Sequence, residues 1–228
     1  MIAMKKRLLI IALIGILLST LMIVGYRILF PNKDLTMEEH DTSHLQADTV
    51  AADSGTKISS IESMIGSFSS VLDSSEVFFT NGGSSGTSGR FNDFNVTLLR
   101  DSVSGKTEIS IVIQSRSVFT FNDLRDRHLK GEEFFNTANF PAITFRSDEL
   151  QQTDSNYIAV GEMKFLGIGN QIKIPFKYLG NSNYPNSVEY HVLEGGFTFN
   201  PGDFGMDVGI TIDEVSDVNF YLELVPSE

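Results

Sequence analysis

Hydrophobic and polar residues alternate along most of the chain after about Phe68. A period of two predicts β-strands that bury one face and expose the other. The alternating segments are TEISIVIQ (107–114), AITFRS (142–147), YIAVGEMKF (157–165), QIKIPFKY (171–178), Val188 to Val192, Phe197 to Phe199, Val208 to Ile212 and Val218 to Leu224. The pattern therefore predicts an all-β domain of about eight strands.

Short stretches rich in Gly, Ser and Asn separate these segments. Examples are TNGGSSGTSG (80–89), DSVSG (101–105) and LGNSNYPNS (179–187). Such short connections are typical of strands that follow one another antiparallel. Eight strands of this kind close into a barrel or form a sandwich, and the pattern alone leaves both architectures open.

One segment, RDRHLKGEEFFNTANFPAITF (125–145), interrupts the alternation. Asn122 or Asp123 can cap a short helix that runs to Lys130. Gly131 then ends the helix, where a glycine readily adopts the left-handed conformation. We therefore expect one short helix in the β domain.

His128 has a catalytic or a structural interpretation. It lies among the charged residues Arg125 and Asp126, as an active-site histidine can, but it shares one helical stripe with Phe121 and Leu124. The stripe predicts that His128 faces the interior as a hydrogen-bonded structural residue. In that case His128→Ala lowers the stability by about 1–3 kcal/mol.

The N-terminus contains no charged residue from Leu8 to Tyr26, a run of 19 residues that follows a basic cluster at 5–7. As a helix this run is about 28 Å long, close to the roughly 30 Å of a bilayer's hydrocarbon core. No small-residue cleavage site follows, so residues 1–30 are expected to form an uncleaved membrane anchor rather than a cleaved signal. The basic cluster favours an N-terminus on the cytoplasmic side.

Residues 31–57 are polar and acidic and have no hydrophobic period, which predicts a linker that leads into a domain at 58–228. Within the linker, His40 and His44 stand four residues apart, a spacing that can present two imidazoles to a metal ion. No apolar face fixes this stretch as a helix. A solvated linker without a metal is therefore the preferred interpretation.

The charge and the missing cysteines exclude several functions. The chain carries a formal net charge of -12, and removing the four basic residues of the first thirty leaves -16 for residues 31–228. Such a surface repels nucleic-acid phosphates, so no nucleic-acid partner is expected. Without cysteine there is no disulfide, thiolate metal site or cysteine nucleophile.

The catalytic motifs that we tested are incomplete. GSSGTSG (83–89) does not form G-x-S-x-G, and DFG at 203–205 lacks every other kinase motif. Nothing places two of the carboxylates of Glu132, Glu133, Asp148 and Glu149 across a cleft. A hydrolase that uses His128 and a carboxylate remains the weakest alternative, and no cofactor is predicted.

The eighteen Phe, six Tyr and no Trp also permit two interpretations. They can form an ordinary aromatic core. They can also line the interior of an eight-stranded barrel, which is just wide enough for one slender ligand. Composition does not separate these possibilities.

Four segments in this order resemble the YceI-like family: RFNDFNVTL (90–98), the block at 111–150, AVGEMKFLG (159–167) and FTFNPGDFGM (197–206). The block is the most specific part. It contains a serine at a strand end, an R-D-x-H-L turn, an F-F pair, an F-P step and an I-T-F-x-S strand. The resemblance implies an eight-stranded antiparallel lipocalin-like barrel that binds a polyisoprenoid chain, such as a quinone tail, without catalysis.

The resemblance also implies where a ligand binds. The residues expected to line or close the lumen are Phe79, Phe91, Phe134, Phe135, Phe140 and Phe145. Arg125, Asp126 and His128 form either a polar rim for the head group or a hydrogen-bonded cluster that fixes the helix to the barrel. The second alternative is favoured.

Together with the anchor, the resemblance predicts a single-pass inner-membrane protein whose barrel faces the periplasm, or a periplasmic protein if the start is cleaved. The expected partners are an isoprenoid lipid and the membrane, and an oligomer stays possible. A structural interaction module with a filled core is the main alternative function.

Overall fold

The described residues of the computed structural model, 60–82, 86–153, 156–208 and 214–227, contain a closed antiparallel barrel of eight strands. The barrel strands are β1 (Gly66–Ser70), β4 (Phe94–Arg100), β5 (Thr107–Gln114), β7 (Ala142–Gln152), β8 (Tyr157–Phe165), β9 (Ile168–Asn183), β10 (Glu189–Phe199) and β11 (Ser216–Pro226). β1 pairs with both β4 and β11, which closes the barrel. The prediction of an eight-stranded antiparallel barrel is thus confirmed.

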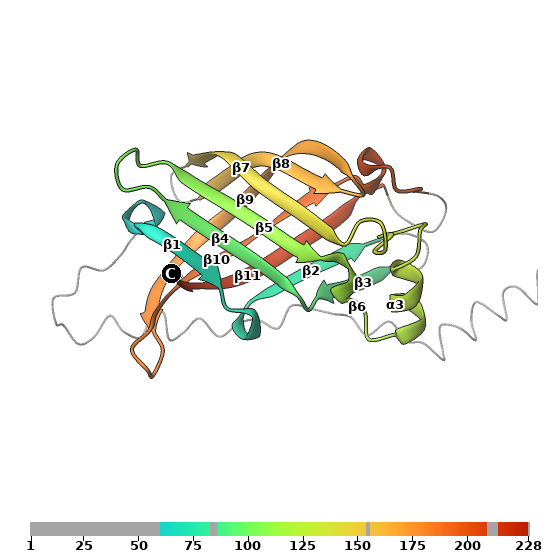
Figure 1. The fold of residues 1–228 in the computed structure, drawn as a ribbon, viewed down its shortest axis with the longest axis horizontal. Coiled ribbons are helices and arrows are strands. Elements are labelled where there is room, and N and C mark those ends of the chain that lie inside the picture. The colour runs from blue at the N-terminus through green and yellow to red at the C-terminus, as the bar shows by residue number, and fades with distance from the viewer. Residues whose placement is uncertain (1–59, 83–85, 154–155, 209–213, 228) are drawn as a thin grey trace, which may run out of the picture. The chain divides into compact units, whose positions relative to one another are not determined.

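Three shorter strands in the described part extend the wall of the barrel at one end. They are β2 (Glu76–Asn81), β3 (Thr87–Phe91) and β6 (Val118–Phe119). β11 pairs with β2 over residues 216–221 and with β1 only over 224–226, so β1 and β2 occupy successive stretches of the same edge. Helix α3 (Asp123–Leu129) lies beside β3 and β6, at the opposite end of the barrel from β1 (Figure 1).

These two ends are called the β1 end and the α3 end below. The β1 end carries the short 3-10 helix η1 (Ile61–Ser63) and the loops between β4 and β5 and between β9 and β10. The α3 end carries η3 (Ser115–Ser117), the turn between β8 and β9, and η4 (Pro201–Phe204). A further 3-10 helix, η2 (Leu72–Ser74), connects β1 to β2.

Helix α3 begins as predicted but does not end as predicted. The Asn122 side chain accepts hydrogen bonds from the backbone N–H groups of Leu124 and Arg125, both at 3.1 Å, and so caps the first turn. Gly131 does not adopt the left-handed conformation that we expected. It donates a backbone hydrogen bond to the His128 carbonyl, and a Cβ at this position would lie 3.0 Å from that oxygen.

The strands near the C-terminus are longer than the alternation indicated. The predicted connection 179–187 is mostly strand, because β9 continues to Asn183, and the segments 188–192 and 197–199 are parts of one strand, β10. Leu193 and Phe197 belong to the core inside the barrel, whereas Tyr190 and Val192, on the other face of β10, pack with Tyr221 in a second cluster, so the apolar positions looked like two strands. The strand expected at 208–212 falls largely outside the described residues.

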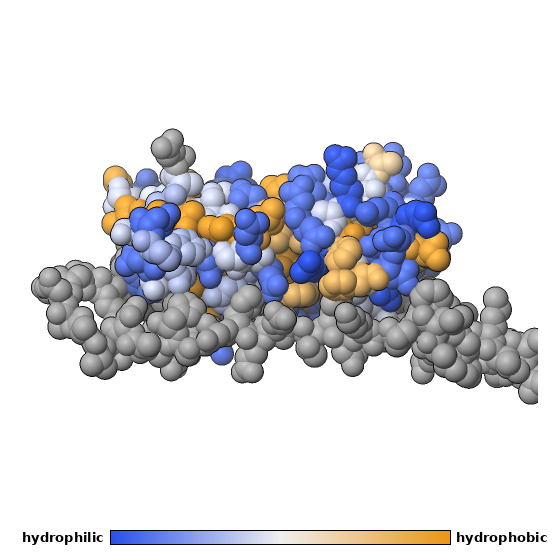
Figure 2. Space-filling model, turned by 90° about the horizontal axis from the view of Figure 1, so that it is seen from below, coloured by the Kyte–Doolittle hydropathy of each residue, from blue (hydrophilic) through white to orange (hydrophobic). Residues whose placement is uncertain are grey.

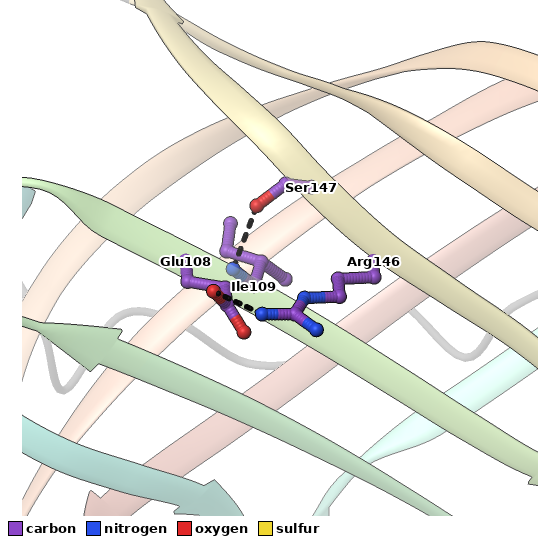
Figure 3. Close-up of polar contacts among 4 residues, drawn as sticks. All are labelled: Glu108, Ile109, Arg146 and Ser147. Atoms are coloured by element: carbon purple, nitrogen blue, oxygen red, sulfur yellow. Dashed lines mark hydrogen bonds and ion pairs between the residues drawn. The ribbon is translucent and has the colours of Figure 1, made fainter.

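Ser147, the serine of the I-T-F-x-S motif, has a structural role in β7. The ladder between β7 and β8 shifts between Ser147 and Glu149. The buried Ser147 hydroxyl accepts the backbone N–H of Ile109 in β5 at 2.7 Å, while Arg146 on the outer face pairs with Glu108 at 2.9 Å (Figure 3). The hydroxyl therefore satisfies a buried donor beside the bulge.

The anchor expected at 1–30 and the linker at 31–57 lie outside the described residues, as do His40 and His44. In the part of the chain that is described, every helix is too short or too polar to cross a membrane.

Candidate ligand-binding site

At the β1 end most inward-facing side chains are almost completely buried, with Leu150 and Tyr178 partly buried. Leu98 and Leu224 have no exposed surface, and η1 adds Ile61 at 0% and Met64 at 1%. Tyr157 fixes η1 here, because its hydroxyl lies 3.3 Å from the Ile61 backbone N–H and 3.1 Å from Oε2 of Glu62. This half of the interior is a packed core.

A polar pair lies within this packed half. His191 is 1% exposed, its Nδ1 is hydrogen-bonded to the Tyr178 hydroxyl at 3.0 Å, and the edge of Phe68 meets its ring. Burial lowers the pKa of His191, although the Glu189 carboxylate partly opposes this effect, and burial raises the pKa of Tyr178. Both groups are therefore kept neutral, and the pair brings no charge into the barrel.

Toward the α3 end, side chains on the same inward face are only partly buried. These residues are Ile111, Ile113, Ile143, Ile172, Phe197, Phe199 and Val218. Ile111 shares its face with the buried Ile109 two residues earlier and pairs with the buried Phe145, so it also points inward. The exposed part of the Ile111 side chain is therefore surface that the other inward-facing side chains do not cover.

Six phenylalanine rings contact one another in this part of the interior. They are called the phenylalanine cluster below: Phe79, Phe91, Phe135, Phe165, Phe199 and Phe204. Neighbouring ring centroids lie 5.4–6.2 Å apart, within the range of favourable aromatic contacts. The cluster joins strands β2, β3, β8 and β10 to η4 and to the segment after α3. It forms an apolar, aromatic wall at the α3 end.

Gly89 in β3 allows the cluster to form. A Cβ at this position would lie 2.6 Å from Cζ of Phe79 and 2.9 Å from the methyl group of Thr120. Because Phe79 and Gly89 are paired across β2 and β3, only a glycine lets the Phe79 ring lie across the neighbouring strand.

The structure brings together three of the six predicted lumen phenylalanines. Phe79, Phe91 and Phe135 meet in the cluster. Phe145 points inward from β7, is 4% exposed and belongs to the same buried core as Phe91 and Phe165. Phe134 packs its ring on His128, and Phe140 lies against Gly167 in the turn between β8 and β9.

Sequence reasoning missed Phe165, Phe199 and Phe204. Phe165 and Phe199 each occupy the last inward position of an alternating segment, so the period of two contained their signal. Phe204 belongs to the D-F-G sequence of η4, a turn, and is 2% exposed. Alternation cannot place a ring that is supplied by a turn.

Arg125 and Asp126 are hydrogen-bonded to the end of β6. Oδ1 of the buried Asp126 accepts the Thr120 backbone N–H at 2.8 Å and its hydroxyl at 2.5 Å. The Arg125 guanidinium donates to the Thr120 hydroxyl at 2.9 Å and to its carbonyl at 2.8 Å. These bonds attach α3 to the barrel, as the structural alternative expected for the two residues.

His128 is not part of this cluster, and the prediction that it faces the interior is wrong. Its side chain is 67% exposed, and Nε2 lies 3.5 Å from the exposed Glu133 carboxylate. Phe121, Leu124 and His128 do share one stripe, but the stripe faces solvent. Phe121 is 49% and Leu124 62% exposed. Helix α3 buries Asp126 and Leu129 instead.

The described residues show no metal centre, and an open hollow lies on the barrel apart from the phenylalanine cluster. They contain no cluster of three His, Asp or Glu side chains that could hold a metal ion. An open hollow of about 370 Å³ is lined by residues of β2, β10 and β11, including Thr80, Thr198, Asp217 and Asn219. Its lining also includes Phe197 and Val218, so polar and apolar groups are mixed, and the open shape does not enclose a hydrocarbon ligand.

The fold and the interior define a class: a closed eight-stranded β-barrel with one packed end and an apolar, aromatic-lined end. Residues 68–224 match the YceI-like domain, which is more than half of the chain. The chain belongs to the YceI-like family.

Relatives and solved structures agree with this assignment. A UPF0312 protein of Yersinia pestis is 31% identical over 126 residues, which are 55% of this chain and 64% of the relative, and a UPF0312 protein of Yersinia enterocolitica matches equally. The matched region thus spans a little under two thirds of these curated relatives.

Among solved structures, BcnA of Burkholderia cenocepacia superposes with a TM-score of 0.60 at 16% identity, covering 68% of this chain and 98% of its own. The Campylobacter jejuni YceI protein gives 0.55 at 20% identity, covering 85% and 100%. A polyisoprenoid-binding domain from Saccharophagus degradans gives 0.56 at 15% identity, covering 70% and 98%. At these identities the likeness concerns the fold.

Proposed function

We propose that this protein binds an isoprenoid lipid, such as a quinone or polyprenyl chain, in the barrel without chemical conversion. The observation that carries the proposal is the set of inward-facing apolar side chains near the α3 end that keep accessible surface. Membership of the YceI-like family and the polyisoprenoid-binding domain of Saccharophagus degradans support this ligand class.

The free energy of such binding comes from removing hydrocarbon from water. At about 0.8 kcal/mol for each buried CH2 group, a five-carbon isoprene unit contributes roughly 3–4 kcal/mol before the cost of ordering the chain is subtracted. The lining residues offer aliphatic and aromatic surface and few polar groups. The width and length of the hydrocarbon therefore determine selectivity more than the head group does.

The proposal includes a location outside the cytoplasm, close to a membrane. The uncharged run from Leu8 to Tyr26 supports an inner-membrane anchor, and the polar residues 31–57 support a tether to the barrel. Carriage, storage and sensing of the lipid are all compatible with such an arrangement.

A pair of neighbouring substitutions in β5 tests where the lipid binds. Ile111 points into the barrel and is partly buried, whereas Val112 points outward and is 38% exposed. Organic extraction of the purified protein followed by mass spectrometry should detect an isoprenoid in the wild type and in Val112→Trp. Ile111→Trp should lose it, because the indole occupies the space of the chain, while circular dichroism shows a folded barrel.

Adding the extracted lipid to delipidated protein should raise the Tm, because a ligand that binds only the folded state stabilises it. If no isoprenoid is extracted and none raises the Tm, the lipid-binding proposal is wrong and the interaction module takes its place. A hydrolase that uses His128 would instead lose turnover in His128→Ala without any loss of bound lipid.

A further inference from the structure

Two large apolar side chains are exposed beside the aromatic end of the barrel. Leu124 on α3 is 62% exposed, and Phe121, just before the helix, is 49% exposed. At the same end, Ile168, the first residue of β9, is 43% exposed. At the right of Figure 2, where the α3 end lies, orange apolar surface appears among the blue hydrophilic residues. Exposed apolar side chains thus lie around the α3 end.

Phe121 is held in its exposed position. Its backbone is left-handed, with φ 57°, and its ring packs on Phe119 with centroids 4.5 Å apart. The Arg90 guanidinium lies over both rings, 5.5 Å and 5.7 Å from their centroids. Arg90 Nε is buried and has no hydrogen-bond partner in the described part of the chain, and the two ring contacts stabilise the guanidinium through cation–π interaction. The helix itself is attached to β6 through Asp126 and Thr120.

The charge of this region also differs from that of the rest of the domain. Residues 31–228 carry a formal charge of -16, but the segment 114–141 is balanced. Its charged residues are Arg116, Arg125, Arg127 and Lys130 against Asp123, Asp126, Glu132 and Glu133. A neutral segment with arginines beside exposed Phe and Leu suits a bilayer interface, where apolar groups insert and cations meet anionic head groups.

The tether is long enough for this end to face the membrane. Residues 31–59 join the uncharged N-terminal run to the barrel, which begins at the β1 end. An extended chain of this length reaches at most about 100 Å, whereas a strand of 11 residues such as β11 spans only about 36 Å. Attachment at the β1 end therefore leaves the α3 end within reach of the bilayer.

We infer that the α3 end is a membrane-docking surface, with Phe121 and Leu124 inserted at the lipid interface and Arg90 and Arg127 at the head groups. The inference rests on the proposed lipid-binding function and adds the route of the ligand. Docking places the phenylalanine cluster against the bilayer, so that an isoprenoid passes between membrane and barrel without crossing water.

The absence of cysteine in the chain makes a direct test possible. The full-length protein carrying Leu124→Cys is labelled with the fluorophore NBD and reconstituted into vesicles of phosphatidylethanolamine, phosphatidylglycerol and a doxyl-labelled lipid. The control is Val103→Cys, a 93% exposed position at the β1 end. Doxyl groups quench only at short range, so the Leu124 probe should be quenched and the Val103 probe should not. Equal quenching of both probes, or none at Leu124, overturns the inference.

A charge-bearing variant tests the consequence for ligand transfer. Phe121→Asp combined with Leu124→Asp should slow the uptake of isoprenoid from vesicles and leave the amount bound at equilibrium unchanged, because the lumen is intact. Val103→Asp should change neither. An uptake rate equal to that of the wild type contradicts the inference.

The two proposals fail in different ways. Quenching at Leu124 without extractable lipid retains docking and refutes lipid binding. Extractable lipid without quenching at Leu124 refutes docking and retains lipid binding.

Discussion

The β1 end and the α3 end of the barrel are built on the same inward-facing alternation, yet the β1 end is the more completely buried of the two. Leu98 and Leu224 near the β1 end have no exposed surface, while Ile111 and Val218 near the α3 end are partly buried. The difference arises from what covers each end. Helix η1 places Ile61 inside the β1 end, whereas at the α3 end β2, β3 and β6 extend the wall.

This difference separates the half of the barrel that contributes most to stability from the half in which we propose that the lipid binds. A packed end supplies the contacts that keep the fold closed, because interiors at crystal-like density lose stability with each missing methylene. An end with uncovered apolar surface gives up part of that stability and retains space for a ligand. Substitutions at equivalent inward positions should therefore have unequal effects at the two ends.

The largest expected effect is the loss of a packed leucine. Leu98→Ala should lower the free energy of unfolding by about 2–5 kcal/mol, because it removes apolar contacts and leaves a closed cavity. Ile111→Ala in delipidated protein should cost at least about 1 kcal/mol less, because its side chain already borders uncovered space. Urea unfolding monitored by circular dichroism measures both. Equal costs would mean that the α3 half is as tightly packed as the β1 half.

The comparison also explains what the sequence could and could not predict. Alternation identified the inward face of β5, β7, β8 and β9, because one side of each alternating segment faces the interior. It could not tell the buried Ile109 from the partly buried Ile111 two positions later, since the burial of an inward residue depends on segments distant in sequence. The ends of β9 and β10 were misplaced because β10 carries apolar residues on both faces, in the barrel core and in a second cluster with Tyr221.

The polar residues of α3 give the next largest effect. Asp126→Ala should lower the free energy of unfolding by about 1–3 kcal/mol, because it leaves the buried N–H and hydroxyl of Thr120 without their acceptor. His128→Ala, two residues further on, should change it by less than about 0.5 kcal/mol because the imidazole is exposed. Denaturant unfolding of the two variants compares them directly. A larger loss for His128 would restore the interior placement that the sequence suggested.

The helix shows why this part of the site was only partly predictable. Its cap at Asn122 follows from local chemistry, and so does the stripe of Phe121, Leu124 and His128. Which stripe faces the barrel depends on the bonds that Asp126 makes to Thr120, and such side-chain bonds to the segment before a helix leave no periodic signal. An apolar stripe was therefore assigned to the core although it faces solvent.

The smallest expected effect is a change in pH dependence at the β1 end. Burial holds the pKa of His191 below its ordinary 6.5, whereas in the unfolded chain this imidazole titrates near that value. As the pH falls below about 6.5, the unfolded state binds a proton that the folded state excludes, so stability decreases with falling pH. His191→Gln, which cannot titrate, should flatten this slope in Tm measured between neutral and mildly acidic pH. The exposed His128→Gln should keep it, and an unchanged slope in His191→Gln would show that the buried pair does not determine the acid response.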